Sequence, residues 1–328
     1  MQISDTVHLI RTPTPFSVGH VNCYLIEDEP LTLIDSGLKT EEAEKVLRAA
    51  LAQLGYDFAD IEQVIITHAH FDHYGLMGTI AAEGKPRVLA HPLEVHDLQN
   101  PIGYAPEGDE RYDRVEQFLL KSGLPPRMLD SILFRHPILN QLRDPIQVTR
   151  TIDDGDIVTL GTMQLRVIHC PGHSAGMVNL LEISSGTLFS GDNILKHISP
   201  VPLLNFPRNP SEPRAHSLAD YLVTLKRLKT LAVRVVLPGH GEIMDNLHDV
   251  IDGIMIHHEM RKDKVLEFLK DSPKTAFEVC LHLFPEVDPY QVYLGMSEAV
   301  GHLDLLECEG VVEARETDGA TRYVAKGV

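Results

Sequence analysis

The run Ile66–Gly75, ITHAHFDHYG, concentrates side chains that bind metal ions. It places His68, His70, Asp72 and His73 within six residues, directly after an apolar stretch. Imidazole nitrogens and carboxylate oxygens are ligands of zinc and related divalent ions. In an extended loop, His68 and His70 point the same way and can hold one ion, while Asp72 and His73 lie beyond the turn and can reach a second. The run predicts the start of a two-metal site.

Three later loops each place one more candidate ligand after an apolar strand. They read CPGHS with His173, FSGDN with Asp192 and LPGHG with His240. Two metal ions that share one carboxylate and one water need about this number of side chains. The predicted ligands are therefore His68, His70, Asp72, His73, His173, Asp192 and His240.

The other histidines lack this context. An isolated histidine on a loop is most often a polar surface residue, and we apply that interpretation to His91, His96, His136, His216, His257 and His258. Two further pairs, His20 with Asn22 and Lys196 with His197, either contact the site or belong to ordinary loop structure.

The elements that must position these loops alternate between strands and helices. Short apolar runs predict strands within 22–35, at 61–67 and 87–92, and within 156–169, 179–192 and 233–241. Apolar residues at helical spacing predict helices at 39–55, 74–84 and 217–231. Ligands carried between a strand end and a helix sit on a rigid frame, which suits a metal site.

Two regions depart from this alternation. Residues 93–146 predict a helical insertion that could form a lid over the site. Residues 246–328 predict three helices and a hairpin at Asp318-Gly319, a winged-helix-like domain beside a catalytic domain at 1–245. The aromatic residues of the insertion either line an acyl pocket or pack its own core, and they are Tyr104, Tyr112, Phe118 and Phe134.

Composition argues against several classes of protein. Lys and Arg number 29 and Asp and Glu number 47, so the net charge is −18, unfavourable for nucleic acid or an anionic membrane. Residues 246–328 hold eight basic against 16 acidic side chains, so we expect them to cap the catalytic domain or build a homodimer. Four cysteines without C-x-x-C spacing, no signal peptide and no membrane-length apolar run predict a cytoplasmic protein.

Residues 5–245 resemble the metallo-β-lactamase superfamily. The resemblance rests on THAHFDHYG, Asp35 in IDSG, and the loops CPGHS, SGDN and PGHG. It implies an α/β fold, an αββα sandwich with the metals at one edge. It also implies a first metal at His68, His70 and His173, a second at Asp72, His73 and His240, and Asp192 as the bridge. Asp35 would steady the histidine loop, and the C-terminal region resembles that of a β-lactamase-like hydrolase subgroup.

The resemblance implies hydrolysis of a small-molecule substrate by a hydroxide that bridges two metals. Asp72 is a candidate proton shuttle. Asp192 stands where the commonest β-lactamases of the superfamily carry Cys or Ser, which favours the thioesterase, lactonase and phosphodiesterase branches. The stretch GDNILKHISP at 191–200 contains no Tyr close behind Asp192, which weakens the lactonase alternative. Met177 replaces a histidine found in glyoxalase II-like members, which argues against a glutathione thioester.

We therefore expect a thioester or carboxylic ester hydrolase, with a phosphodiesterase or ribonuclease, or a lactonase, as the alternatives. Zinc is the expected metal, and iron or manganese would suit the same nitrogen and oxygen ligands. A di-iron oxygen reductase is disfavoured because the C-terminal region lacks a glycine loop for a flavin phosphate.

Overall fold

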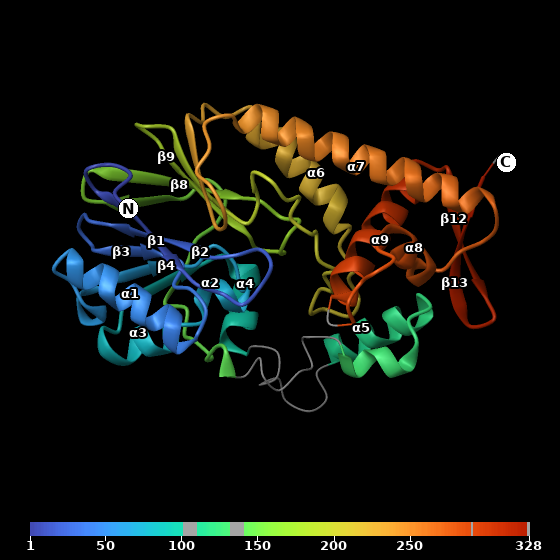
Figure 1. Cartoon of the computed structure of the whole chain (residues 1–328), viewed down its shortest axis with the longest axis horizontal. Coiled ribbons are helices and arrows are strands. Elements are labelled where there is room, and N and C mark those ends of the chain that lie inside the picture. The colour runs from blue at the N-terminus through green and yellow to red at the C-terminus, as the bar shows by residue number, and fades with distance from the viewer. Residues whose placement is uncertain (101–109, 132–140, 290, 327–328) are drawn as a thin grey trace.

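The computed structural model describes residues 1–100, 110–131, 141–289 and 291–326. The N-terminal part of the chain is built on a pair of mixed sheets (Figure 1). The first sheet contains, in spatial order, β1 (Val7–Thr12), β2 (Val21–Ile26), β3 (Thr32–Ile34), β4 (Gln63–Ile65), β5 (Arg87–Ala90) and β6 (Arg150–Thr151). The second contains β11 (Val235–Pro238), β10 (Thr187–Gly191), β9 (Val178–Glu182), β8 (Met163–His169) and β7 (Ile157–Leu160). Strands β3 to β6 are parallel, as are β10 and β11.

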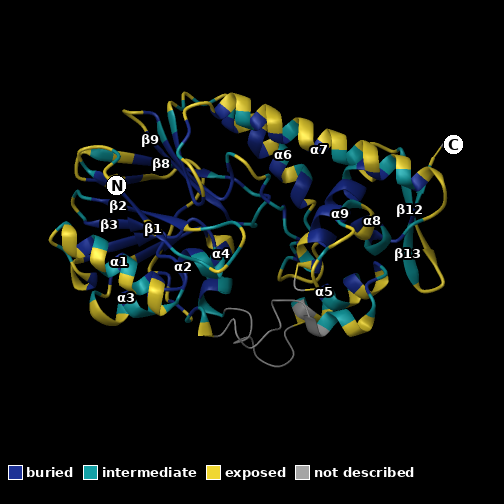
Figure 2. Ribbon diagram, viewed as in Figure 1, coloured by how far each residue is buried: buried dark blue, intermediate teal, exposed yellow. Residues whose placement is uncertain are grey.

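The two sheets enclose one core, and helices cover their outer faces (Figure 2). Ile34, Leu180 and Phe189 belong to the core between the sheets. The helices of this part are α1 (Glu41–Gln53), α2 (Phe71–Tyr74), α3 (Met77–Glu83), α4 (Pro92–Gln99) and α6 (Ser217–Leu228), with a short 3-10 turn, η1 (Phe58–Asp60). The first four pack with the first sheet, and α6 packs with the second.

Helix α1 illustrates how local sequence sets an element. The Thr40 hydroxyl accepts a hydrogen bond from the Ala43 amide, and Glu41 and Glu42 lie in the first turn, where negative charge is favourable. Ala43, Leu47 and Leu51 recur at helical spacing and are all buried. The predicted helix at 39–55 is confirmed, and its apolar stripe explains why it lies on the sheet.

A second core lies beyond the sandwich. It is built by α7 (Leu247–Lys270), α8 (Ala276–Leu283), α9 (Val292–Cys308) and the hairpin of β12 (Val312–Thr317) and β13 (Ala320–Ala325). Helix α7 spans both parts, because Ile251 and Ile254 pack with the sandwich while Val265 and Leu269 pack in the second core. No described helix, including the 24-residue α7, combines the length and apolarity needed to cross a membrane.

The region 93–146 is divided between the two cores. Leu98 of α4 packs with the sandwich, whereas Val115 and Leu119 of α5 (Glu110–Lys121) pack beneath α8 and α9 (Figure 1). A 3-10 turn, η2 (Pro126–Ser131), follows α5. Phe118 joins this second core, while Tyr104 and Phe134 lie outside the described residues and the Tyr112 side chain is not described. The domain boundaries at 245 and 246 stay a prediction.

Most predicted elements are present, including the strand, turn and strand of 22–35, the helix at 217–231 and the hairpin at Asp318-Gly319. Strand β1 was not predicted, although it pairs with β2 over its whole length. The second core has the predicted three helices and β-ribbon. Its winged-helix character stays a prediction.

Replacement of Phe189 tests how much the packing between the two sheets contributes to the free energy of unfolding. Its ring is 1% exposed and packs edge-on against Tyr24, with 5.3 Å between ring centroids. Phe189→Ala should lower the free energy of unfolding by about 3–5 kcal/mol because it leaves a cavity in a closed core. Urea denaturation monitored by circular dichroism measures this loss. Val223→Ala, at a side chain 66% exposed on α6, is the control and should stay within about 0.5 kcal/mol. Equal stability of the two variants would contradict the packing described.

Candidate metal centre

Four loops at one edge of the sandwich bring the seven predicted ligands together. The first follows β4 and carries His68, His70, Asp72 and His73 through the start of α2. The loops after β8, β10 and β11 carry the remaining three, His173, Asp192 and His240. The carboxyl ends of parallel neighbours meet at one sheet edge, which is why residues far apart in sequence converge here.

Three histidines form the first group of converging atoms. His70 Nδ1 lies 2.8 Å from His68 Nε2 and 2.9 Å from His173 Nε2. His68 is fully buried, and the other two are half-buried. These are the three residues that the family resemblance assigns to a first metal, and their nitrogen atoms lie close enough together to bind one ion.

A second group consists of Asp72, His73 and His240. His240 Nε2 lies 3.4 Å from Asp72 Oδ2, and His73 Nε2 lies 3.9 Å from the same oxygen. Asp192 lies between the groups, since its carboxylate is 3.3 Å from His73, 3.4 Å from His240 and 3.6 Å from His173. The arrangement therefore contains two sets of ligand atoms and one carboxylate within reach of both.

The hydrogen bonds of the outward-facing Nδ1 atoms fix the tautomers of four histidines. His73 Nδ1 donates to Asp35 Oδ2 at 2.8 Å, His173 Nδ1 to the Val201 carbonyl at 2.9 Å, and His240 Nδ1 to the His20 carbonyl at 2.9 Å. His68 Nδ1 donates at 3.0 Å to the Thr67 hydroxyl, which itself donates to Asp35. In the neutral form of each ring the lone pair is then on Nε2, which points into the centre.

These lone pairs indicate that a cation fits the centre. His73 Nε2, His240 Nε2 and Asp192 Oδ1 are buried and make no hydrogen bond. His70 Nδ1 faces two other ring nitrogens, His68 Nε2 at 2.8 Å and His173 Nε2 at 2.9 Å. Protons shared among these three nitrogen atoms cannot satisfy all of their lone pairs. A buried polar atom without a partner is costly, and a metal ion would satisfy several at once. The His and Asp groups are consistent with the metal site of the metallo-β-lactamase family.

The acid–base properties of the two groups differ. Burial, followed by the neighbouring His173, lowers the pKa of His70 to about 3, so its ring is neutral near pH 7 and keeps its lone pair. Burial opposes a charge on His240, but Asp192 and Asp72 outweigh it and raise the pKa of His240 to about 10. The carboxylates of Asp72 and Asp192 thus favour positive charge in the second group. A divalent ion can supply that charge in place of protons.

Asp35 organises the histidine loop, as the family resemblance implies. Its Oδ1 accepts a hydrogen bond from the Thr67 amide at 2.9 Å, and its Oδ2 accepts from the Thr67 hydroxyl and His73 Nδ1, each at 2.8 Å. The residue is 1% exposed and adopts a positive φ of 56°. One carboxylate therefore orients a histidine from each predicted metal group, His73 directly and His68 through Thr67.

The sequence analysis missed Glu94, at the start of α4. Its carboxylate accepts hydrogen bonds from the Ala69 amide at 2.9 Å, the Ser174 hydroxyl at 2.8 Å and the Gly176 amide at 2.6 Å. Ala69 lies between two ligands of the first group and Ser174 follows the third, so Glu94 joins the two loops that carry them. The sequence signal for this residue is an acidic side chain soon after the apolar strand β5. In the structure Glu94 is 4% exposed.

The Asn22 side chain braces the loop of His240, and the other three residues of the two predicted pairs make different contacts. The side-chain amide of Asn22 donates hydrogen bonds to the carbonyls of Pro238 and Gly241 at 2.9 and 3.2 Å. His20 contributes through its backbone carbonyl. Lys196 pairs with Glu242 at 2.7 Å, and His197 is 68% exposed.

Two histidines interpreted as surface residues are buried, which corrects that prediction. His91 caps α4, and its ring stacks on His169 with 4.1 Å between centroids. His258 is 1% exposed and contacts the Ser199 hydroxyl at 2.9 Å and His302 at 3.3 Å. Both are held by neighbouring polar groups, a context that sequence spacing does not reveal. His96 is half-buried, His216 and His257 are exposed, and His136 lies outside the described residues.

Comparison with known proteins places this geometry in a family. Residues 17–240 match the model for the metallo-beta-lactamase superfamily, and residues 263–326 match that for the metallo-beta-lactamase-like C-terminal domain. The chain is 33% identical over 314 residues, covering 94% of each protein, to "Probable metallo-hydrolase YqjP" of Bacillus subtilis. It is 29% identical over 236 residues to acyl-coenzyme A thioesterase MBLAC2 of Gallus gallus, covering 68% of this chain and 73% of that protein.

A solved structure shares the whole architecture. A metallo-beta-lactamase family protein from Thermus thermophilus superposes with a TM-score of 0.83 at 28% identity, covering 99% of this chain and 100% of the other. The match includes the C-terminal part, so both proteins combine a two-sheet α/β fold with a small C-terminal domain. This chain belongs to the metallo-beta-lactamase superfamily and is a metal-dependent hydrolase of that superfamily.

Proposed function

We propose that this chain hydrolyses acyl thioesters at a centre of two zinc ions. The observation that carries the two-metal part is Asp192, whose carboxylate lies within 3.6 Å of histidines from both groups. His68, His70 and His173 would hold one ion, Asp72, His73 and His240 the other, and Asp192 would bridge them. Zinc suits this mixture of imidazole and carboxylate ligands. Bound there, the ions would supply Lewis-acid activation of a water molecule and of the substrate carbonyl.

The side chains of the site divide the remaining work. Asp35 and Glu94 hold the ligand loops in place from behind, so the geometry does not depend on the substrate. Asp72 is the more solvent-accessible of the two carboxylates among the ligands, at 13% of its side chain against 9% for Asp192. We infer that Asp72 accepts a proton from the attacking water and passes it to the leaving sulfur.

The choice of a thioester rests on two supports. Asp192 would be the bridging carboxylate, which in the superfamily favours the thioesterase, lactonase and phosphodiesterase branches. Among these, the chain aligns over 68% of its length with the chicken acyl-coenzyme A thioesterase. The stretch 191–200 around Asp192 contains no Tyr, which argues against the lactonase branch. The excess of acidic side chains in residues 246–328 argues against a nucleic-acid substrate.

The reaction class can be tested with two chromogenic assays. Zinc-loaded protein should hydrolyse an acyl thioester well and bis-p-nitrophenyl phosphate poorly, and His70→Ala should lose nearly all thioester turnover because it removes a shared contact of the first group. Metal analysis should find two zinc ions per chain in the parent protein and fewer in the variant. Faster phosphodiester than thioester hydrolysis would contradict the proposal.

Asp72 can be tested apart from metal binding. Asp72→Asn keeps the size of the side chain but lowers its basicity, so kcat should fall by roughly 10²–10⁴-fold, the typical contribution of general acid–base catalysis. The measurement is kcat for the acyl thioester in samples that contain two zinc ions per chain, with zinc content determined on the same samples. Unchanged kcat in fully loaded Asp72→Asn would show that Asp72 moves no proton in the slow step.

Glu94 should control metal affinity without touching the metal. In Glu94→Gln one carboxylate oxygen becomes an NH₂ group that faces N–H or O–H donors, so the loops of the first group should separate. Zinc affinity, measured by competition with a chromogenic chelator, should fall about 10–100-fold, as for other residues that support metal ligands. Glu42→Gln, at an exposed position of α1, is the matched control. Equal zinc affinity in the two variants would refute the role of Glu94.

A further inference from the structure

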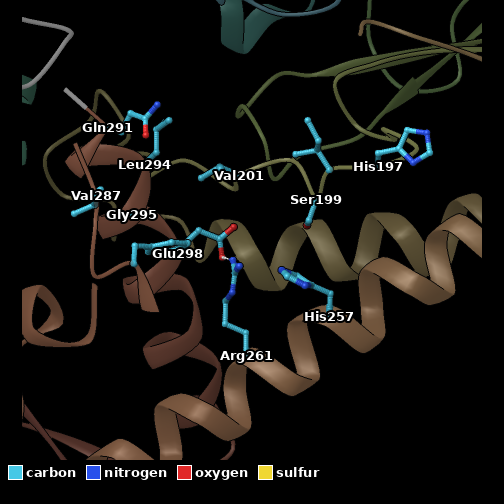
Figure 3. Close-up of a pocket in the computed structure, with 12 residues that line it drawn as sticks. His197, Ser199, Val201, His257, Arg261, Val287, Gln291, Leu294, Gly295 and Glu298 are labelled. Atoms are coloured by element: carbon cyan, nitrogen blue, oxygen red, sulfur yellow. Dashed lines mark ion pairs between the residues drawn. The ribbon is translucent and has the colours of Figure 1, made fainter. Parts of the chain in front are cut away.

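Two hollows lie along helix α7, outside the metal centre, and Figure 3 shows the first of them. The first, of about 360 Å³, is enclosed by residues 197–201, α7, the segment after α8, and α9. The second, of about 150 Å³, continues along α7. The two share His257 and Arg261 as lining residues and are together called here the α7 groove.

The first hollow begins at the loop that backs the metal centre. Val201 lines the hollow, and its carbonyl accepts the hydrogen bond from His173 Nδ1 at 2.9 Å. One residue therefore borders both the first metal group and the groove. The first hollow thus begins one hydrogen bond away from a ligand of the first metal group.

The lining of the first hollow is mainly apolar. Val201, Phe284 and Val287 contribute to it, and Ile198 and Leu294 stand at its edge with 50% and 40% of their surfaces exposed. Large apolar side chains so exposed around one hollow are typical of a ligand site. Such a surface suits a flexible arm of hydrocarbon and amide groups.

Arg261 lines both hollows and forms an ion pair with Glu298. Its Nη1 lies 2.9 Å from Glu298 Oε2, and its guanidinium lies 5.0 Å from the centroid of the Phe284 ring (Figure 3). Glu298 is 3% exposed, whereas the Arg261 side chain keeps 20% exposure toward the groove. A guanidinium has more N–H groups than one carboxylate oxygen can use, so a preorganised donor faces the groove.

The second hollow is basic in an otherwise acidic region. Its lining includes Arg261, Lys264, His257 and His282 and no carboxylate. His257, Arg261 and Lys264 are spaced by four and three residues and share one face of α7. Arg261 and Lys264 are the cations of this lining, since burial, Arg261 and Lys264 lower the pKa of His257. They stand out because residues 246–328 hold eight basic against 16 acidic side chains. Such a cluster is suited to phosphate groups.

We propose that the α7 groove binds the carrier of a coenzyme A thioester, with the pantetheine arm in the first hollow and the phosphates beside Arg261 and Lys264. This inference rests on the proposed thioesterase function and names its substrate class. The order of features along the groove matches that of the ligand. The metal centre takes the thioester, the apolar hollow takes the arm, and the basic hollow takes the charged end.

The test compares thioesters with and without phosphates. The parent protein should show a much lower KM for an acyl-coenzyme A than for the same acyl group on pantetheine. Lys264→Glu should raise the KM for acyl-coenzyme A about tenfold and leave kcat, and both constants for acyl-pantetheine, within twofold. Lys226→Glu is the matched control, an exposed lysine near the end of α6 that lines neither hollow, and should change nothing.

A binding measurement separates the groove from the reaction. S-ethyl-coenzyme A cannot be hydrolysed, and calorimetry should show that it binds the zinc-loaded parent protein about tenfold more tightly than Lys264→Glu, with a difference that shrinks at high salt. Equal affinity of the two proteins, or no binding by either, would overturn the α7 groove as a carrier site. Selective binding without hydrolysis of any thioester would instead overturn the proposed function and leave the groove as a coenzyme A site.

Discussion

The direction of the Nδ1 hydrogen bonds is the constraint on which the metal centre depends. The Nδ1 atoms of four histidines each donate a hydrogen bond to an acceptor on a different part of the chain. These bonds orient the rings so that their Nε2 atoms converge on the centre. Each buried polar atom left without a partner costs about 1–3 kcal/mol. Several such atoms together would consume much of the roughly 5–15 kcal/mol by which a domain is stable. Metal binding and folding are therefore linked in this chain, because the ion satisfies atoms that the fold forces together.

The fold supplies that constraint through backbone geometry at the strand ends. Gly239 lets the loop after β11 approach Asp192 so closely that any Cβ there would collide with the Asp192 carboxylate. Gly172 adopts a φ of 140° beside the backbone of Tyr221, a conformation and a contact that other residues avoid. The glycines in CPGHS and LPGHG thus bring the ligand loops within reach of one another. These glycines act sterically, because they lack the Cβ atoms that would hold the loops apart. The core between the two sheets fixes the strand ends from which the loops start.

Much of this was predictable because the ligands lie in short, distinctive sequence patterns. The spacing of His68, His70, Asp72 and His73 identified the seed of the centre, and apolar runs located the strands that deliver the other ligands. Glu94 was missed because its importance comes from three donors that converge only in the folded chain. His258 was misjudged for the same reason, since its burial depends on the contact between α7 and α9. Sequence spacing reports on neighbours within one element, whereas these residues act between elements.

The C-terminal part is structurally joined to the centre rather than merely appended to it. The Ser199 hydroxyl contacts His258 on α7, and the Leu204 amide donates to Ser297 on α9 at 3.1 Å. The loop thus held also contains Val201, the acceptor for His173. A displacement of α7 or α9 would therefore be transmitted within two or three residues to a metal ligand. The hydrogen bonds of Ser199, Leu204 and Val201 thus connect the C-terminal helices to the loops of the metal centre.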